Sequence, residues 1–366
     1  MFHANPDGRK QAETGLSWRK NTNRNYCSPT SDYRGADLNR NFDFMWACCG
    51  GSSSNPCNET YHGASPSSEP EVQAIQDYIL SLFPDQRGPD VNDAAPPDAT
   101  GLFIDLHSHG RLTLWPWSWT PSPSPNNSGL QTIGRKLAYF DGHTPKQGYG
   151  LYPMDGEAMG FSYGMLGIPA YLIELGTAFF QDCTYFENTI VPDNIPTLLY
   201  ALKIARTPYL TSMGPDSINI ALDIGSAPAG IPAGTIVTME ATIDDTRYSA
   251  AGGAEPTQNV IAAEYYIDVP PWVISPVPVA IAMSSKDAVF DEKIEDVEAV
   301  IDTTGWSEGQ HIIFVRGQDA DGDWGAFSAA FLYISNSIDI DGWLITCIFI
   351  LIFSLLFMHR YIGVST

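Results

Sequence analysis

The sequence of 366 residues predicts an α/β domain, followed by an all-β sandwich and a C-terminal membrane-spanning helix. Three observations support this order. Short apolar runs that end in polar residues indicate buried strands in the first half of the chain. Beyond about Pro215, β-branched residues alternate with polar ones between glycines, prolines and aspartates, which is typical of short antiparallel strands. Near the C-terminus, residues 343–358 carry no charge.

The first half mixes helix and strand patterns. Apolar residues at helical spacing predict a helix over 69–83, and a second, closing helix is predicted over 195–205. The runs 102–107 and 170–175 each end in polar groups, as buried strands that lead into a site do. The segment 84–100 is rich in proline, aspartate and alanine and is predicted to be a surface loop.

The second part, residues 215–335, is predicted to be an immunoglobulin-like β-sandwich. The alternation is clear in 235–243 and again in 310–316. Three carboxylates then stand at alternate positions in a predicted hairpin turn: Asp319, Asp321 and Asp323. They could bind Ca²⁺, but the glycine is not where a helix-loop-helix calcium loop needs it, so a solvated turn is the alternative.

The net charge of −23 excludes one class of partner. A strongly negative chain repels a phosphate backbone, so no nucleic-acid partner is expected. The charge is also unevenly spread. Residues 1–214 carry 14 basic and 21 acidic side chains, whereas residues 215–335 carry 4 and 19, which supports a division into two domains.

The tail is predicted to be a transmembrane helix over 342–358. A buried core helix is the alternative, but the run has no polar face. Arg360 beyond the run places the C-terminus in the cytoplasm, so everything before the helix is expected outside the cytoplasm, at the cell surface. The first nine residues contain no apolar stretch of the kind found in a signal peptide.

Four of the six cysteines lie between Cys27 and Cys57, in a stretch rich in serine, asparagine and glycine. This composition predicts a long surface loop closed by a disulfide in an oxidising compartment, and free buried thiols are the alternative. No Cys-x-x-Cys spacing occurs, which disfavours a zinc ribbon.

The most informative feature is an ordered series of polar groups in the first 180 residues. The series consists of Asn5-Pro6-Asp7-Gly8-Arg9, Trp18-Arg19-Lys20, Asp37-Leu38-Asn39-Arg40-Asn41-Phe42-Asp43, Cys57-Asn58-Glu59-Thr60-Tyr61-His62-Gly63, His107, Tyr152 and Glu174. It resembles the zinc metallocarboxypeptidases of the carboxypeptidase A type over about residues 4–205. The resemblance implies a catalytic domain over 1–210 with a mixed sheet and flanking helices, incomplete at its N-terminus.

The resemblance assigns substrate-binding roles. A lone arginine is usually a surface group, but Arg40 beside Asn39 places a planar fork next to an amide, which suits a free terminal carboxylate. The family role of this pair is to grip the C-terminus of the substrate peptide or protein. Tyr152 matches the mobile tyrosine that closes over it. Met159 matches a residue that contacts the departing side chain, and its apolar character points to an apolar or aromatic C-terminal residue.

The catalytic roles follow in the same way. Arg19 matches the arginine that polarises the scissile carbonyl. Glu174 lies among apolar residues, where a carboxylate is either a structural ion pair or has a raised pKa, and the resemblance makes it the general base. His107 matches a zinc ligand, whereas His109 is expected to be a wall residue. Cys57 matches a family cysteine whose plausible partner is Cys27.

One family feature is absent. The other two zinc ligands come from a His-x-x-Glu motif, and no histidine here is followed by glutamate three residues later. We expect that these ligands lie upstream of Met1, so that these residues alone are an inactive fragment of a longer Zn²⁺ enzyme. Loss of the metal is the alternative, which would give a non-catalytic surface protein that binds peptides or mediates adhesion.

Overall fold

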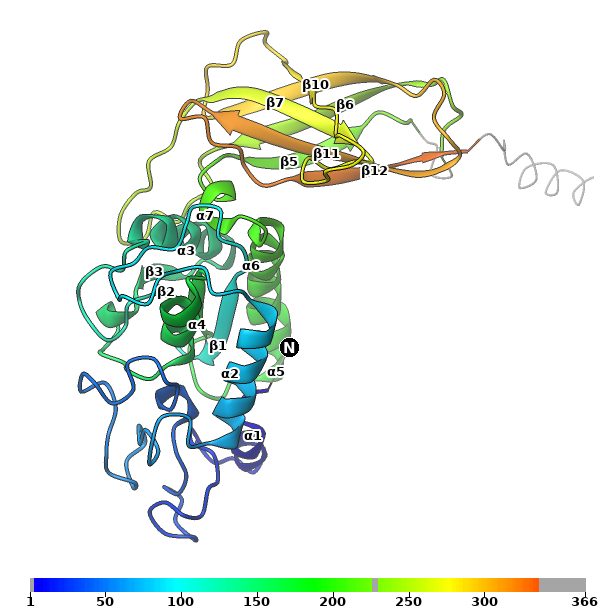
Figure 1. Ribbon diagram of the computed structural model, residues 1–366. Helices are drawn as coiled ribbons and strands as arrows, with labels where there is room; N and C mark the ends of the chain where they lie inside the picture. Colours follow the sequence, from blue (N-terminus) through cyan, green and yellow to red (C-terminus); the bar gives the residue numbers. More distant parts are fainter. Residues whose placement is uncertain (1–2, 226–229, 336–366) are drawn as a thin grey trace, which may run out of the picture.

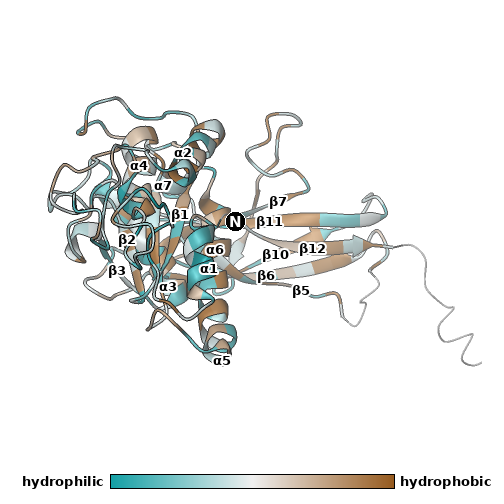
Figure 2. Cartoon of the chain, turned by 90° about the horizontal axis from the view of Figure 1, so that it is seen from below, coloured by the Kyte–Doolittle hydropathy of each residue, from teal (hydrophilic) through white to brown (hydrophobic). Residues whose placement is uncertain are grey.

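The computed structural model describes residues 3–225 and 230–335. The chain folds into an α/β unit and a two-sheet unit that lie end to end (Figure 1). Helix α1 (Pro6–Ala12) begins the α/β unit. It is hydrophilic in Figure 2, and Gly8 is its buried residue.

The α/β unit contains a four-stranded mixed sheet with the order β1-β4-β2-β3. The strands are β1 (Phe103–Ser108), β2 (Leu112–Trp115), β3 (Thr144–Gln147) and β4 (Ala170–Leu175). Strand β1 runs parallel to β4, whereas β2 runs antiparallel to β4 and parallel to β3. The two predicted strands and the predicted mixed sheet are therefore confirmed.

Helices flank this sheet (Figure 1). They are α2 (Pro70–Leu82), α3 (Asn127–Asp141), α4 (Ala158–Leu166), α5 (Cys183–Tyr185), α6 (Val191–Ile204) and α7 (Pro208–Thr211). Three short turns complete the unit: the 3₁₀ turns η1 (Leu38–Arg40) and η2 (Gly148–Gly150), and the π-helical η3 (Phe186–Ile190). The predicted helix over 69–83 is confirmed as α2. No helix or strand lies between α2 and β1, as predicted.

The closing helix begins earlier than the sequence predicted. It starts at Val191, because η3 runs directly into it. Pro192 is tolerated in the first turn of α6, because a backbone N–H there needs no partner within the helix. Helix α3 packs on the sheet with Gly134 facing Trp115. A Cβ at Gly134 would lie 2.8 Å from the Trp115 ring, so glycine permits this close contact.

The second unit contains two antiparallel sheets of four strands. One consists of β5 (Asp216–Leu222), β6 (Ile236–Asp244), β10 (Ile294–Asp302) and β9 (Ser284–Ser285). The other consists of β12 (Ser328–Ile334), β11 (Gly309–Asp319), β7 (Val260–Ile267) and β8 (Ile281–Ala282). Inward-facing side chains such as Val237, Ile243 and Val315 form its core. The all-β prediction is confirmed, and its immunoglobulin-like topology stays a prediction.

The predicted calcium turn follows β11. The Asp319 carboxylate accepts the backbone N–H groups of Asp321 and Asp323 at 3.0 and 2.9 Å, which is the arrangement of an ordinary Asx turn. Across 3–225 and 230–335, no three acidic, histidine or cysteine side chains gather as a metal site would require. Calcium binding here stays a prediction without further support.

Charged pairs join the two units. Lys136 of α3 lies 3.0 Å from Asp216 of β5, and both side chains are buried. Arg135, the preceding residue on α3, pairs with Glu255 at 3.1 Å, also in the interior. Asp216 additionally accepts from Arg247 at 3.0 Å. The contact between the units therefore includes buried ion pairs.

Within the part of the chain that the structure covers, no helix has the length and apolar character needed to cross a bilayer. The predicted membrane helix over 342–358 lies outside the described residues. The domain limits 1–210 and 215–335 stay predictions, although the last strand of the first sheet ends at Leu175 and the first strand of the others begins at Asp216.

Candidate active site

Two predicted catalytic residues meet at one edge of the mixed sheet. Strands β1 and β4 are parallel, and their register places His107 directly opposite Glu174. Because both residues lie near the carboxyl ends of their strands, they face the edge where α/β sheets bind ligands. The apolar runs that predicted these strands thus deliver an imidazole and a carboxylate to the same place.

His107 is oriented by a neighbour that the sequence did not single out. Its Nε2 lies 2.7 Å from an Asp105 carboxylate oxygen and 3.1 Å from the Asn39 side-chain nitrogen. With Nε2–H donating to Asp105, Nδ1 keeps its lone pair, which is the form that binds a metal. Burial alone lowers the pKa of His107, but the negative charges of Asp105 and Glu174 outweigh it and raise the pKa.

Arg19 reaches the same site from the loop after α1. Its Nε donates to the Asp37 carboxylate at 2.7 Å, and Asp37 is almost fully buried. The Asp37 charge raises the pKa of the Arg19 guanidinium against the effect of burial, and Tyr152 and Glu174 add smaller contributions in the same direction. Arg19 is therefore a fixed positive charge close to Glu174.

The pair Asn39 and Arg40 forms the short turn η1, which Asp37 caps by accepting the Asn39 N–H at 3.1 Å. The Arg40 side chain is fully buried, and its Nε donates to the Gly51 carbonyl at 3.1 Å. The Asn39 amide oxygen accepts the Ala158 N–H at 2.8 Å. Hydrogen bonds to the backbone thus fix the positions of both side chains.

Tyr152 is the next predicted site residue, and it contacts Arg40. Its hydroxyl accepts from Arg40 Nη2 at 3.4 Å, and 44% of its surface is exposed. Met159 stands in the first turn of α4 and is fully buried. The side chain of Tyr152 is the least confined of the predicted site residues, which suits a residue that moves when a ligand binds.

Glu174 is 9% exposed, and its Oε2 has no hydrogen-bond partner among the described residues. Burial raises the pKa of this carboxyl, whereas the positive charges of His107 and Arg19 oppose the rise. A carboxylate in this state is ready to accept a proton from a molecule bound beside it. The predicted residues Arg19, Asn39, Arg40, His107, Tyr152 and Glu174 therefore all come together.

His109, by contrast, does not join the cluster of ligating atoms. It follows the end of β1, and its ring packs edge-to-face on Phe179 at 4.6 Å. Phe179 and Ser108 line a hollow of about 290 Å³, which lies between the ends of β1 and β4 and the segment before α6. His109 itself is exposed and contacts Phe179 of this hollow, so its place in a pocket wall stays a prediction.

Sequence reasoning missed three acids at this site. Asp105 stands two residues before His107 on β1, so the alternation of a strand was the available signal. Asp155 accepts the N–H groups of Cys49 and Gly51 at 3.1 and 3.0 Å and so holds the loop that contacts Arg40. Glu157 is buried just before α4, and nothing in the local sequence marks it as buried.

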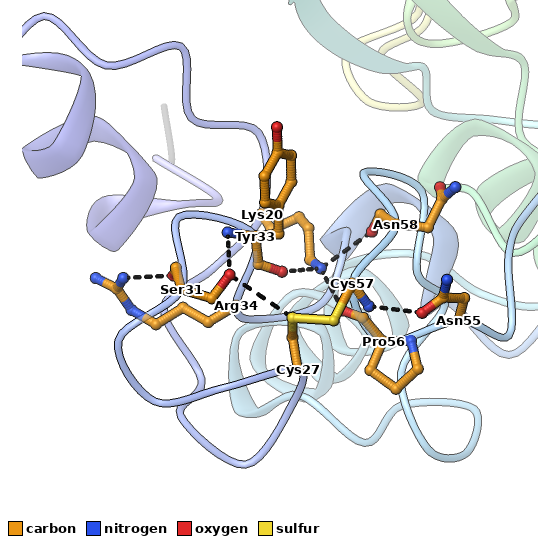
Figure 3. Close-up of a disulfide and its surroundings, with 9 residues drawn as sticks. All are labelled: Lys20, Cys27, Ser31, Tyr33, Arg34, Asn55, Pro56, Cys57 and Asn58. Carbon is orange, nitrogen blue, oxygen red and sulfur yellow. Dashed lines mark hydrogen bonds between the residues drawn. A yellow bond between two sulfur atoms is a disulfide. The ribbon is translucent and has the colours of Figure 1, made fainter.

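The loops that carry Arg19 and Arg40 are fastened by the predicted disulfide. Cys27 and Cys57 are bonded with an S–S distance of 2.05 Å (Figure 3). Beside them, the buried Lys20 donates to three backbone carbonyls, those of Tyr33, Pro56 and Asn58, at 2.6, 2.8 and 3.0 Å (Figure 3). The predicted stapled loop is confirmed.

The loop also holds a disulfide that the sequence did not predict. Cys48 and Cys49, which are adjacent in the chain, are bonded to each other, and the exposed Cys183 is a free thiol.

The described residues do not supply the full set of ligands for the zinc ion that the resemblance implies. His107 offers one nitrogen, but the ranges 3–225 and 230–335 contain no group of three histidine, cysteine or acidic side chains with the geometry of a metal site. A catalytic zinc site needs three protein ligands. The described residues therefore do not hold such an ion by themselves.

Comparisons with known proteins find related sequences. The profile of the family described as zinc carboxypeptidase matches residues 1–194. Zinc carboxypeptidase A 1 of Anopheles gambiae is 35% identical over 206 residues, which cover 53% of this chain and 42% of that protein. The zinc carboxypeptidase of Simulium vittatum is 34% identical over 180 residues, which cover 47% and 53%.

Two further proteins are similar. Carboxypeptidase B of Bos taurus is 32% identical over 157 residues, which cover 41% of this chain and 33% of that protein. The solved structure of carboxypeptidase A from Helicoverpa armigera matches with 25% identity and a TM-score of 0.45, covering 56% and 49%. The chain spans about a third to a half of the length of the curated relatives it matches.

Proposed function

This chain belongs to the zinc carboxypeptidase family, and we propose that it binds the C-terminal residue of a peptide or protein and acts in hydrolysing the peptide bond before that residue. The observation that carries the proposal is the convergence of Asn39, Arg40, His107 and Glu174 at one sheet edge. No internal stretch of peptide has the free carboxylate that this set of donors fits.

Recognition of the chain end falls to Arg40 and Asn39. The buried Arg40 guanidinium points an Nη2 donor at the Tyr152 hydroxyl, which a ligand carboxylate can replace. The Asn39 side-chain nitrogen supplies a second donor, because its oxygen is already committed to Ala158. Tyr152 then packs over the bound residue and excludes water.

The chemical step uses Arg19 and Glu174. Arg19, held by Asp37, is the positive charge available to the carbonyl oxygen of the scissile bond as negative charge develops on it. Glu174 accepts the proton of the attacking water at its unpartnered Oε2 and delivers it to the departing amine nitrogen. This transfer leaves the carboxylate as it began.

Family membership implies zinc, and His107 would hold it through Nδ1. Because the described residues contain no group of three ligands, the steps above involve only side chains of this chain. The same observation favours a second candidate function, in which the carboxylate clamp binds peptide ends without hydrolysis, as a surface binding or adhesion protein would.

The test compares one labelled peptide with its C-terminal amide, using fluorescence anisotropy on the 366-residue chain. We expect the free acid to bind at least about tenfold more tightly, because the amide lacks the charge that Arg40 recognises. Equal affinities would overturn the proposal. Tyr152→Ala removes the ring that packs over the bound residue and should weaken binding of the acid, whereas Tyr333→Ala on β12, far from the site, serves as the matched control.

The same preparation separates the two candidate functions. With Zn²⁺ added, release of the C-terminal amino acid that disappears in Glu174→Gln supports the peptidase. Tight binding of the acid without any release supports the non-catalytic candidate. Release that persists in Glu174→Gln would contradict the role given to that carboxylate.

We also propose that the chain works in an oxidising, extracytoplasmic compartment. The Cys27–Cys57 disulfide beside the site supports this location. Labelling of free thiols in protein taken directly from its source cells tests it, because Cys27 and Cys57 should be unreactive before reduction. Labelling of both without a reductant would contradict the location.

A further inference from the structure

The disulfide between the neighbouring residues Cys48 and Cys49 contributes little to holding the fold together. A disulfide stabilises a protein mainly by restricting its unfolded chain, and the effect grows with the length of the loop that it closes. The Cys27–Cys57 bond joins residues 30 positions apart, whereas the Cys48–Cys49 bond joins adjacent ones. Because a bond between adjacent residues closes almost no loop, its effect is confined to the backbone beside it.

That backbone leads directly to the Arg40 side chain. The N–H groups of Cys49 and Gly51 both donate to one oxygen of the buried Asp155 carboxylate, at 3.1 and 3.0 Å. The Gly51 carbonyl in turn accepts from Arg40 Nε at 3.1 Å. A Cβ at Gly51 would lie 2.6 Å from the Met154 Cα, so the chain is packed tightly here and fixes the carbonyl. The disulfide therefore lies two residues from the group that orients the Arg40 guanidinium.

The backbone before the disulfide is held in a conformation that most residues avoid. Met45 and Ala47 have φ values of 53° and 48°, in the left-handed region that favours glycine. Residues keep such values only where their surroundings enforce them. The covalent ring that joins Cys48 to Cys49 directly follows Ala47 and restrains it. We expect this segment to relax when the bond opens, and Gly51 to shift with it.

A reductant can reach this bond. Cys48 and Cys49 are both exposed, as is the following Gly50, whereas Cys27 of the other disulfide is partly buried. Thiol–disulfide exchange needs access to a sulfur atom, so an exposed bond is attacked more readily than a partly buried one. The Cys48–Cys49 bond can therefore open while the α/β unit stays folded.

We propose that the Cys48–Cys49 disulfide is a redox switch for the carboxylate clamp formed by Asn39 and Arg40. The site binds chain ends while the bond is intact and loses affinity when the bond is reduced. This inference rests on the proposed binding of chain ends by those two residues. In the reduced form the Gly51 carbonyl is no longer fixed, so the Arg40 guanidinium loses the acceptor that orients it.

The reductant is a dithiol. One of its thiolates attacks a sulfur of the disulfide and forms a mixed disulfide, which the second thiol of the reductant then resolves. Two electrons and two protons pass to the protein, so that Cys48 and Cys49 become thiols. The dithiol leaves as its own disulfide.

The test measures binding of a labelled peptide and of its C-terminal amide to the 366-residue chain, before and after treatment with dithiothreitol. In the wild-type chain we expect the free acid to bind about fivefold more weakly after reduction, which is the effect of one lost hydrogen bond. Reoxidation should restore the affinity. Alkylation of the free thiols, followed by mass spectrometry of the peptides, shows which cysteines were reduced.

Two variants assign the effect to the proposed bond. The double variant Cys48→Ser and Cys49→Ser should bind the acid as weakly as the reduced wild-type chain does, and dithiothreitol should not weaken its binding further. Cys183→Ser removes an exposed free thiol and is the control, so it should respond to reduction as the wild-type chain does.

The inference is overturned if the wild-type chain with Cys48 and Cys49 reduced binds the acid as tightly as the oxidised chain, a result that needs no variant to fold. It is equally overturned if the folded double variant binds as tightly as the oxidised wild-type chain, because the effect of reduction would then belong to Cys27–Cys57. Equal binding of acid and amide by the oxidised chain would instead refute the proposed function.

Discussion

At the contact between the two units, Lys136 and Asp216 are buried and paired, whereas in the candidate active site Glu174 is buried and its Oε2 has no hydrogen-bond partner among the described residues. Both regions bury charge in a protein interior. They differ in whether the protein itself supplies the opposite charge.

This difference separates structural from functional burial. A buried ion pair is strongly destabilising to break, because the remaining charge has no solvent and no partner. A buried acid without a partner takes part in no such pair. A ligand that supplies the missing partner explains why such an acid is buried. The buried ion pairs therefore hold the two units together, whereas the unpaired acid at the sheet edge agrees with the proposed binding of peptides.

The largest loss of stability is expected when one charge of the buried pair is removed. Lys136→Met leaves Asp216 buried with Arg247 as its remaining partner, and we expect a loss of about 3 kcal/mol in the free energy of unfolding, measured with urea. Lys286→Met removes the exposed pair with Glu240, in which the two side chains are 40% and 50% exposed, and should cost at most about 1 kcal/mol. Equal losses would contradict the distinction.

A smaller effect is expected at Asp245, an acid at the contact whose Oδ1 has no partner there. Burial, reinforced by Asp319 and Asp216, raises its pKa to about 7 against the Gln258 N–H and Lys136. The folded state therefore keeps a proton that the unfolded chain releases, and stability falls as the pH rises from about 4 to about 7.

Asp245→Asn removes that dependence. The variant should be about 1 kcal/mol more stable than wild type at pH 8 and no more stable at pH 4. Thermal unfolding at the two pH values measures this. A stability difference that does not change with pH would show that Asp245 titrates normally.

The smallest effect on stability is expected in the active site. Glu174→Gln removes a carboxylate whose Oε2 is unpartnered, so the free energy of unfolding should change by less than about 1 kcal/mol. Glu255→Gln is the matched control, since Glu255 is buried to a similar extent but pairs with Arg135, and it should cost about 2 kcal/mol or more. A larger loss for Glu174→Gln would make that residue structural.

Much of the fold could be predicted from the sequence. Helix α2 and strands β1 and β4 have strong apolar periodicity, so their positions follow from burial alone. Strand β3, Thr144–Gln147, could not be found in this way, because it contains a proline, a lysine and no apolar run. It is a strand because β2 provides a parallel neighbour at the edge of the sheet.

Some residues of the candidate site could likewise be predicted from the sequence, and others could not. Arg40, His107 and Glu174 were recognised because they stand in an ordered series of motifs, and the fold brings them together. Glu157 was missed because an acid after a glycine in a loop reads as solvated. Only the packing of α4 against the clamp reveals that it is buried.

The most direct measurement is a structure of the chain with a bound peptide. We expect the terminal carboxylate of the peptide within hydrogen-bonding distance of Arg40 and Asn39. A peptide bound away from this sheet edge, or a terminal carboxylate that contacts neither residue, would contradict the proposed function.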